Sequence, residues 1–130
     1  MITHQNEVEL GRRFEFGKNW NDFIQKNYGQ DKVDISRRHM LDFMGRENLE
    51  GLTFLDIGCG SGLHSIAALQ AGARSVHGFD YDPNSVAATR YVQSQAGNPS
   101  NWTAEQGSVL DDAFVARLPQ FDMVYSWGVL

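Results

Sequence analysis

The stretch FLDIGCGSG, Phe54 to Gly62, decides the fold of this chain. Its first half is typical of a short buried strand, and from Ser61 onward apolar residues recur at helical spacing. Three alternating glycines join the strand to the helix, so the backbone can turn sharply with no Cβ to keep a ligand away. The helix also offers free N–H groups at its start. The pattern therefore predicts a loop that binds a nucleotide cofactor.

The spacing of the glycines separates two classes of cofactor. A dinucleotide fingerprint, GxGxxG, would place its third glycine where this chain has Leu63. Asp56, two residues before Gly58, suits a ligand with a cationic group and fits a diphosphate poorly, because two anions would face each other. These features argue against a nicotinamide-dependent oxidoreductase, which stays the least favoured alternative.

A second strand is expected over residues 75–79 and ends in Asp80, twenty residues after Gly60. An acidic side chain at that place can accept both hydroxyls of a ribose. Asp82 is a rival, but Asp82-Pro83 is also a strong helix start, so we assign Asp80 to ribose and Asp82 to capping. Tyr81 either lays its ring against adenine or is a half-exposed aromatic residue at a strand end.

A third strand is expected over residues 102–107, before the loop Ser108–Asp112. This loop either contacts a ligand or caps the next helix, with Asp111 or Asp112 at its start, and the two roles are compatible.

A fourth strand is expected over residues 121–125. Ser126 and Trp127 follow it and are candidate site-lining residues, although a tryptophan after an apolar strand is equally well a core residue.

The motifs DIGCGSG, FDYDP, QGSVLDD and FDMVYSWG, between Leu52 and Leu130, resemble those of class I S-adenosylmethionine-dependent methyltransferases in order and spacing. The resemblance implies that the glycine loop holds the methionine and ribose part of S-adenosylmethionine, and that the loop after the third strand contacts adenine. Where the family usually has an aspartate this chain has Ser108, so the Val109 backbone N–H is the expected donor. The residues expected to bind the cofactor are Asp56, Gly58, Cys59, Gly60, Asp80, Tyr81, Ser108, Val109 and Ser126.

Strands and helices alternate from Leu52 onward, which predicts an α/β fold with a Rossmann-like, doubly wound parallel sheet. Right-handed crossovers place the four strands in the order 3-2-1-4. Residues 51–130 are expected to form the cofactor-binding domain, incomplete at its C-terminus because the family sheet has seven strands.

Residues 1–50 are expected to form a helical segment that packs on the sheet or covers the cofactor. Its two helical pieces are expected over residues 20–27 and from Ser36 to Met44 or Leu49. Four aromatic residues at its start are candidates for a lid: Phe14, Phe16, Trp20 and Phe23.

Composition narrows the function further. A formal net charge of −5 over 130 residues argues against a general nucleic-acid surface. No apolar run approaches the roughly 18 residues of a membrane span, and the N-terminus lacks the apolar core of a signal peptide, so a cytoplasmic protein is expected. No metal site is expected, because the histidines show no ligand spacing and Cys59 is the single cysteine. Catalysis by Cys59 is disfavoured, since no base is evident beside it.

The sequence therefore predicts a methyltransferase, or the cofactor-binding part of one. The expected acceptor is a small molecule, with protein acceptors left open, and no catalytic base can be named. The alternative is a non-catalytic module that binds the cofactor and pairs with a second copy through the exposed edge of the fourth strand.

Overall fold

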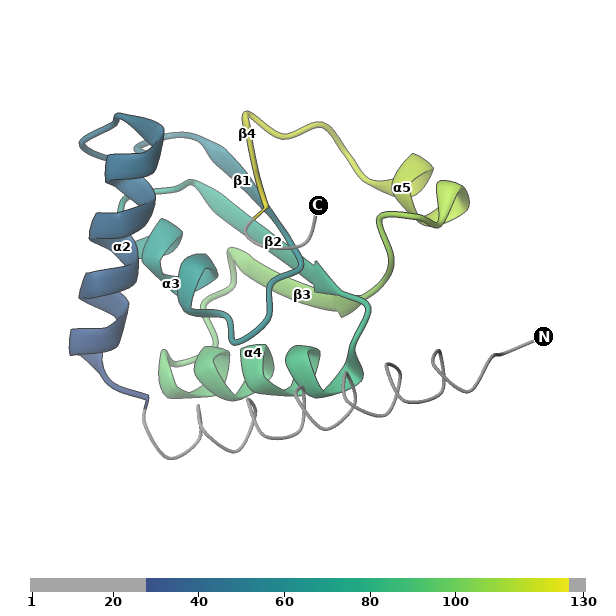
Figure 1. Cartoon of the computed structure of the whole chain (residues 1–130), viewed down its shortest axis with the longest axis horizontal. Helices are drawn as coiled ribbons and strands as arrows, with labels where there is room; N and C mark the ends of the chain where they lie inside the picture. The colour runs from purple at the N-terminus through teal and green to yellow at the C-terminus, as the bar shows by residue number, and fades with distance from the viewer. Residues whose placement is uncertain (1–27, 127–130) are drawn as a thin grey trace, which may run out of the picture.

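The computed structural model describes residues 28–126, which form a four-stranded parallel sheet with helices on both faces (Figure 1). The strand order is β3-β2-β1-β4, so the predicted Rossmann-like sheet and its order 3-2-1-4 are confirmed. The elements are α2 (Gln30–Met44), β1 (Thr53–Ile57), α3 (Leu63–Gln70), β2 (Ser75–Asp80), α4 (Pro83–Gln95), β3 (Trp102–Gln106), α5 (Asp112–Arg117) and β4 (Met123–Ser126).

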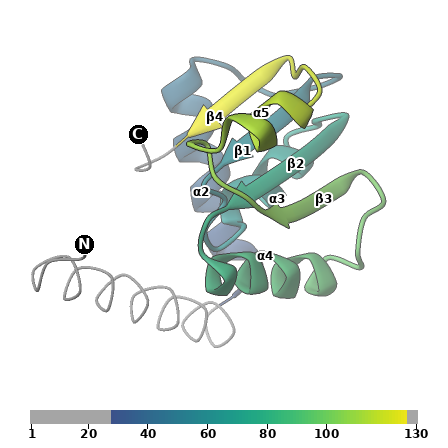
Figure 2. The ribbon, with the colours of Figure 1, turned by 90° about the vertical axis from the view of Figure 1, so that its right-hand side faces the viewer.

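The main core lies between the sheet and the helices α2, α3 and α4. Successive residues of a strand point to opposite faces, so Phe54 enters this core while Leu55 enters a smaller cluster with Phe79 and Phe114 of α5. Figure 2 shows α5 on the face of the sheet opposite α2 and α3. A Cβ on Gly107 would lie 2.3 Å from the Phe114 ring, so the glycine after β3 leaves room for this second cluster.

Helix α2 begins at Gln30, and the prediction of a start at Ser36 is wrong. Val33 and Met40 are both fully buried, one before Ser36 and one after it. Packing of this longer apolar stripe against the core outweighs the local capping preference of a serine. The expected helix over 20–27 and the four aromatic lid candidates lie outside the described residues.

The other helix starts follow the caps read from the sequence, with one exception. Asp82 accepts a hydrogen bond from the Asn84 N–H at 2.9 Å and caps α4, as predicted. Of the two candidates before α5, Asp111 is the cap. Helix α3 begins at Leu63 rather than Ser61, because Gly62 has a left-handed φ of 83° and serves as the N-cap.

Strand β4 is held beside β1 at its beginning by a reciprocal pair of hydrogen bonds. The Thr53 N–H donates to Asp122 Oδ2 at 3.0 Å, and the Asp122 N–H donates to Thr53 Oγ1 at 2.8 Å. With its side chain tied to Thr53, Asp122 precedes the strand, which begins at Met123 rather than Phe121. No helix within residues 28–126 is long and apolar enough to cross a membrane.

Candidate functional site

The loop after β1 has the conformation that its glycines predict. Gly58, Gly60 and Gly62 have φ values of 71°, 53° and 83°, all in the left-handed region that favours glycine. The N–H groups of Gly58 and Cys59 both donate to the Phe79 carbonyl, at 2.8 and 2.9 Å. The loop is therefore tied to the end of β2, and these two N–H groups are already used within the protein.

Two glycines of the loop differ in what surrounds them. A Cβ on Gly60 would meet only the Gly58 carbonyl oxygen, at 3.8 Å, so this side of Gly60 is open. A Cβ on Gly62 would lie 3.0 Å from Thr89 Cα. Gly62 thus permits close packing of the loop against α4, while Gly60 leaves space in which a ligand can approach the main chain.

Asp80 lies directly beside this open glycine. Its Oδ2 accepts a hydrogen bond from the Gly60 N–H at 3.0 Å, and its Oδ1 accepts one from the Asp82 N–H at 2.9 Å. A carboxylate oxygen can accept two hydrogen bonds, so each oxygen keeps capacity for one more donor. The carboxylate is therefore oriented by the backbone and able to accept a pair of hydroxyl groups.

Asp56 is placed differently from Asp80. Its side chain is only 2% exposed, and its Oδ2 accepts a hydrogen bond from Ser65 Oγ of α3 at 2.7 Å. The pKa of Asp56 is raised to about 6, mainly by burial. The Ser65 hydrogen bond opposes this rise in pKa, and the Asp80 charge adds to it. The carboxylate thus lies inside the protein against α3, and its direct contact with a cationic ligand stays a prediction.

Cys59 is a buried thiol, 5% exposed. Burial, with the nearby Asp56 charge as the next cause, raises the pKa of Cys59 to about 12, so the thiol is protonated at neutral pH. A Cβ on Gly78 would lie 3.0 Å from Cys59 Cβ, so the glycine in β2 makes room for this side chain. The environment of Cys59 is that of a space-filling residue and not of a nucleophile.

The residues expected to contact adenine lie at the same edge of the sheet. The ends of β2 and β3 are adjacent, with Asp80 in register with Gln106. Tyr81 is 60% exposed just beyond β2, and Val109 lies partly buried beside the second cluster. Ser108 Oγ accepts a hydrogen bond from the Leu110 N–H at 3.1 Å, so that hydroxyl helps to shape its own loop.

Leu110 and Ser126 complete the surroundings of this edge. Leu110 belongs to the loop expected to contact a ligand, and it is 88% exposed. Ser126 is in register with Ile57 just before the glycine loop, and its buried Oγ has no hydrogen-bond partner among the described residues. Trp127 lies outside them.

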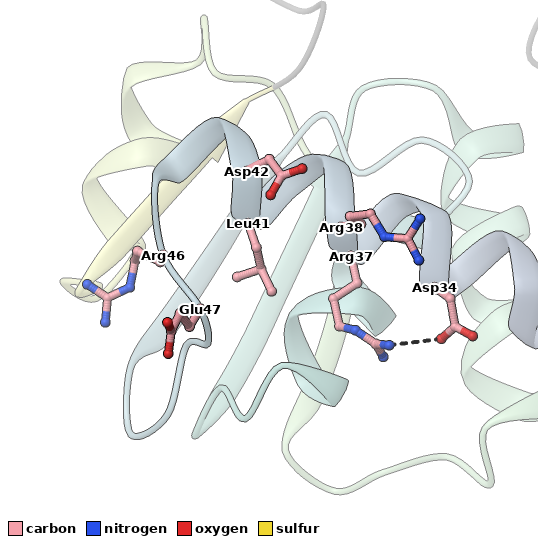
Figure 3. Close-up of a pocket in the computed structure, with 7 residues that line it drawn as sticks. All are labelled: Asp34, Arg37, Arg38, Leu41, Asp42, Arg46 and Glu47. Carbon is pink, nitrogen blue, oxygen red and sulfur yellow. Dashed lines mark hydrogen bonds and ion pairs between the residues drawn. The ribbon is translucent and has the colours of Figure 1, made fainter.

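One surface pocket lies on α2 and the turn that follows it. Figure 3 shows its charged side chains, including an ion pair of 3.0 Å between Arg37 and Asp34. The mixture of both charges favours no single class of ligand. Another pocket lies along β2 and β3, and there His77 Nε2 is 2.8 Å from Glu105 Oε2. Neither pocket contains a residue that the sequence assigned to the site.

The strand order, the glycine loop after β1 and the acid at the end of β2 define a class I S-adenosylmethionine-dependent methyltransferase fold. Residues 38–122 match the family model described as ribosomal protein L11 methyltransferase (PrmA). The chain belongs to this family. The predicted class, and S-adenosylmethionine as the cofactor of that class, are thereby confirmed.

A curated relative supports the family, and solved structures share the fold. The ribosomal protein L11 methyltransferase of Acinetobacter baumannii is 33% identical over 134 residues, covering 95% of this chain and 41% of the relative. A methyltransferase structure from Methanococcus maripaludis is 20% identical, covers 89% of this chain and 50% of its own, and has a TM-score of 0.63. Magnesium protoporphyrin IX methyltransferase from Synechocystis, solved with S-adenosylhomocysteine bound, is 26% identical with a TM-score of 0.54, covering 79% and 47%.

The comparisons also correct the expected partner. The chain spans about two fifths of the length of the curated relatives that it matches along almost its whole length. These relatives are named for a ribosomal protein as acceptor, so the expectation of a small-molecule acceptor is wrong. The physical reason is that a net charge of −5 argues against nucleic acid but does not separate small molecules from proteins.

Proposed function

We propose that this chain binds S-adenosylmethionine and forms the cofactor-binding part of a methyltransferase whose acceptor is a protein. The observation that carries the proposal is the pairing of Asp80 with the Gly60 N–H beside a glycine that has open space above it. Family membership supports the reaction, and the names of the relatives support a ribosomal protein such as L11 as the acceptor.

In this proposal the residues around the loop have distinct roles. Asp80 accepts the two ribose hydroxyls with the lone pairs that the backbone leaves unused. Gly60, with Gly58 and the Cys59 backbone, lets the methionine part approach the main chain. Adenine then lies at the neighbouring strand ends, against Tyr81, Ser108 and Val109.

Charge supports a cofactor that carries a positive sulfur. Asp56 and Asp80 are two carboxylates at the ends of adjacent strands, and both favour a cation nearby. Ser126 contributes a buried hydroxyl at the end of β4 that has no hydrogen-bond partner among residues 28–126, and a ligand could supply one.

The chemistry asked of these residues is mainly that of binding and orientation. When bound, the cofactor supplies an electrophilic methyl group. The protein then has to hold the acceptor atom in line at roughly 3 Å and keep bulk water away. No residue from 28 to 126 is assigned as a general base. The histidine of α3 is His64, and burial together with the charge of His39 lowers its pKa.

The test is a calorimetric titration of the protein with S-adenosylmethionine and S-adenosylhomocysteine, with NAD as a control ligand. We expect saturable binding of both adenosyl compounds and none of NAD. The acceptor is tested by incubation with purified L11 protein and radiolabelled S-adenosylmethionine. Absence of binding would overturn the cofactor proposal. Binding without label on L11 would contradict the acceptor and favour a module that binds without catalysis.

A further inference from the structure

We propose that Thr89 of α4 is a positioning residue for the cofactor, because its hydroxyl holds the Gly60 peptide in the orientation that the ligand meets. This inference rests on the proposed function, since it concerns the same loop. It assigns a role to a residue that lies 29 positions from the glycine it contacts and belongs to none of the motifs that identify the site.

The first observation is the direction of the Thr89 hydroxyl. Thr89 is completely buried, and its Oγ1 lies 3.0 Å from the Gly60 carbonyl oxygen, to which the hydroxyl donates. Cys59 Sγ is the next acceptor, 3.3 Å from the same oxygen. A threonine within a helix commonly bonds back to a carbonyl of its own preceding turn. Here the hydroxyl instead reaches from the middle of α4 to the loop after β1.

The second observation is that Gly60 is held from both sides. Its N–H donates to Asp80 Oδ2, and its carbonyl accepts from Thr89, so both of its backbone polar groups are fixed by side chains. The side where a Cβ would stand is open. A loop held in this way loses little conformational entropy when a ligand binds, which favours affinity.

The third observation is the fit of the loop around Thr89. A Cβ on Gly62 would lie 3.1 Å from Thr89 Oγ1 and 3.2 Å from its Cγ2, so the loop packs closely around this side chain. Helix α4 begins at Pro83, and its N-cap Asp82 lies two residues after the acid at the end of β2. One helix therefore connects the loop expected to hold the methionine part with the acid expected to hold the ribose.

The competing explanation is that Thr89 only fills space in the core. Two substitutions separate the explanations. Thr89→Val keeps the branched shape and removes the hydroxyl, whereas Thr89→Ser keeps the hydroxyl and removes a methyl group. Val92→Ala is the matched control, because Val92 is also fully buried on α4 and belongs to the main core cluster, which contains none of residues 58–62. It creates a cavity in the same helix.

The experiment measures the dissociation constant of S-adenosylhomocysteine for each variant, together with its melting temperature. Loss of the hydroxyl in Thr89→Val should weaken binding about 5- to 10-fold, the effect of one ordinary hydrogen bond. Thr89→Ser should bind within about twofold of the unaltered protein. Val92→Ala should melt at a lower temperature and keep its affinity.

A second measurement follows hydrogen exchange of the Gly60 amide without ligand. It should be faster in Thr89→Val and unchanged in Val92→Ala, provided that both are compared well below their melting temperatures. Equal affinities and equal exchange in Thr89→Val and the unaltered protein would overturn this proposal while leaving the proposed function standing. Absence of binding by the unaltered protein would overturn the proposed function and this inference with it.

Discussion

The carboxylate of Asp80 and the backbone N–H of Gly60 are joined by a hydrogen bond of 3.0 Å, which links the end of β2 to the loop after β1. The two strands are in parallel register up to Ile57 and Phe79, so this contact continues their pairing beyond the last ladder residues. The residue expected to bind ribose is thus also a structural support for the glycine loop.

Replacement of Asp80 should therefore affect binding strongly. Asp80→Ala removes the acceptor of two hydroxyl groups and leaves the Gly60 N–H unpaired, which should weaken S-adenosylmethionine binding by about 1 to 3 kcal/mol. Asp82→Ala is the control: it removes the cap of α4 and costs about 1 kcal/mol of stability, with little effect on affinity. Titration calorimetry distinguishes them, and an unchanged affinity in Asp80→Ala would move the ribose contact elsewhere.

Substitution of Gly60 should block the site with little damage to the fold. Gly60→Ala places a methyl group in open space at a φ of 53°, so its stability cost is the left-handed strain of roughly 1 to 2 kcal/mol. Gly97→Ala is matched, with a φ of 82° and nothing within 4 Å of the added Cβ. Both variants should melt at similar temperatures, and only Gly60→Ala should lose binding of S-adenosylhomocysteine. Equal affinities in the two variants would show that the ligand does not approach Gly60.

The Cys59 thiol should be unreactive in the folded protein. It is buried, and its pKa of about 12 leaves almost no thiolate at pH 8. Ellman's reagent should release no chromophore from the native protein within minutes and one equivalent after unfolding in guanidinium, since the chain has one cysteine. Rapid reaction of the native protein would contradict the buried placement of the loop.

Asp56 should make the stability depend on pH in a defined window. Its folded-state pKa of about 6 lies above the ordinary 3.8, so between these values the folded protein binds more protons than the unfolded chain. The contribution of Asp56 to the free energy of unfolding therefore falls by roughly 3 kcal/mol as the pH rises from about 4 to 6. It is constant above that window.

The comparison that isolates this effect uses Asp56→Asn, which cannot ionise and can still accept a hydrogen bond from Ser65. Urea unfolding between pH 4 and 7 should show the stability of the variant rising relative to the unaltered protein as the pH increases. A constant difference across this range would mean that Asp56 titrates near its ordinary pKa.

Much of the sheet could be predicted from the sequence because several local signals agree there. The loop from Phe54 to Gly62 combines an apolar strand, alternating glycines and a helical repeat, and each signal indicates the same turn. Asp82 before Pro83 marks the start of α4 in the same way. Right-handed crossovers then leave one order for the four strands.

The remaining features depend on contacts between residues far apart in the sequence, and local sequence patterns do not predict such contacts. Helix α2 starts six residues before Ser36 because Val33 is buried in the core together with α3. The contact of Thr89 with Gly60 requires α4 to cross behind the loop. The burial of Asp56 against Ser65 depends on which face of β1 meets α3. The class of methyl acceptor has no signature within residues 28–126 that charge or spacing could identify.

The bonds between Thr53 and Asp122 also bear on how the chain assembles. They join residues 69 positions apart, and β1 needs β4 as its second neighbour in the sheet. During synthesis β1, β2 and their helices leave the ribosome before β4 does. The glycine loop can therefore pack against β2 while one edge of β1 has no strand beside it. Closing so long a stretch of chain is slow compared with forming local turns. Strand β1 is therefore made early in synthesis, but its pairing is completed only after β4 has been made.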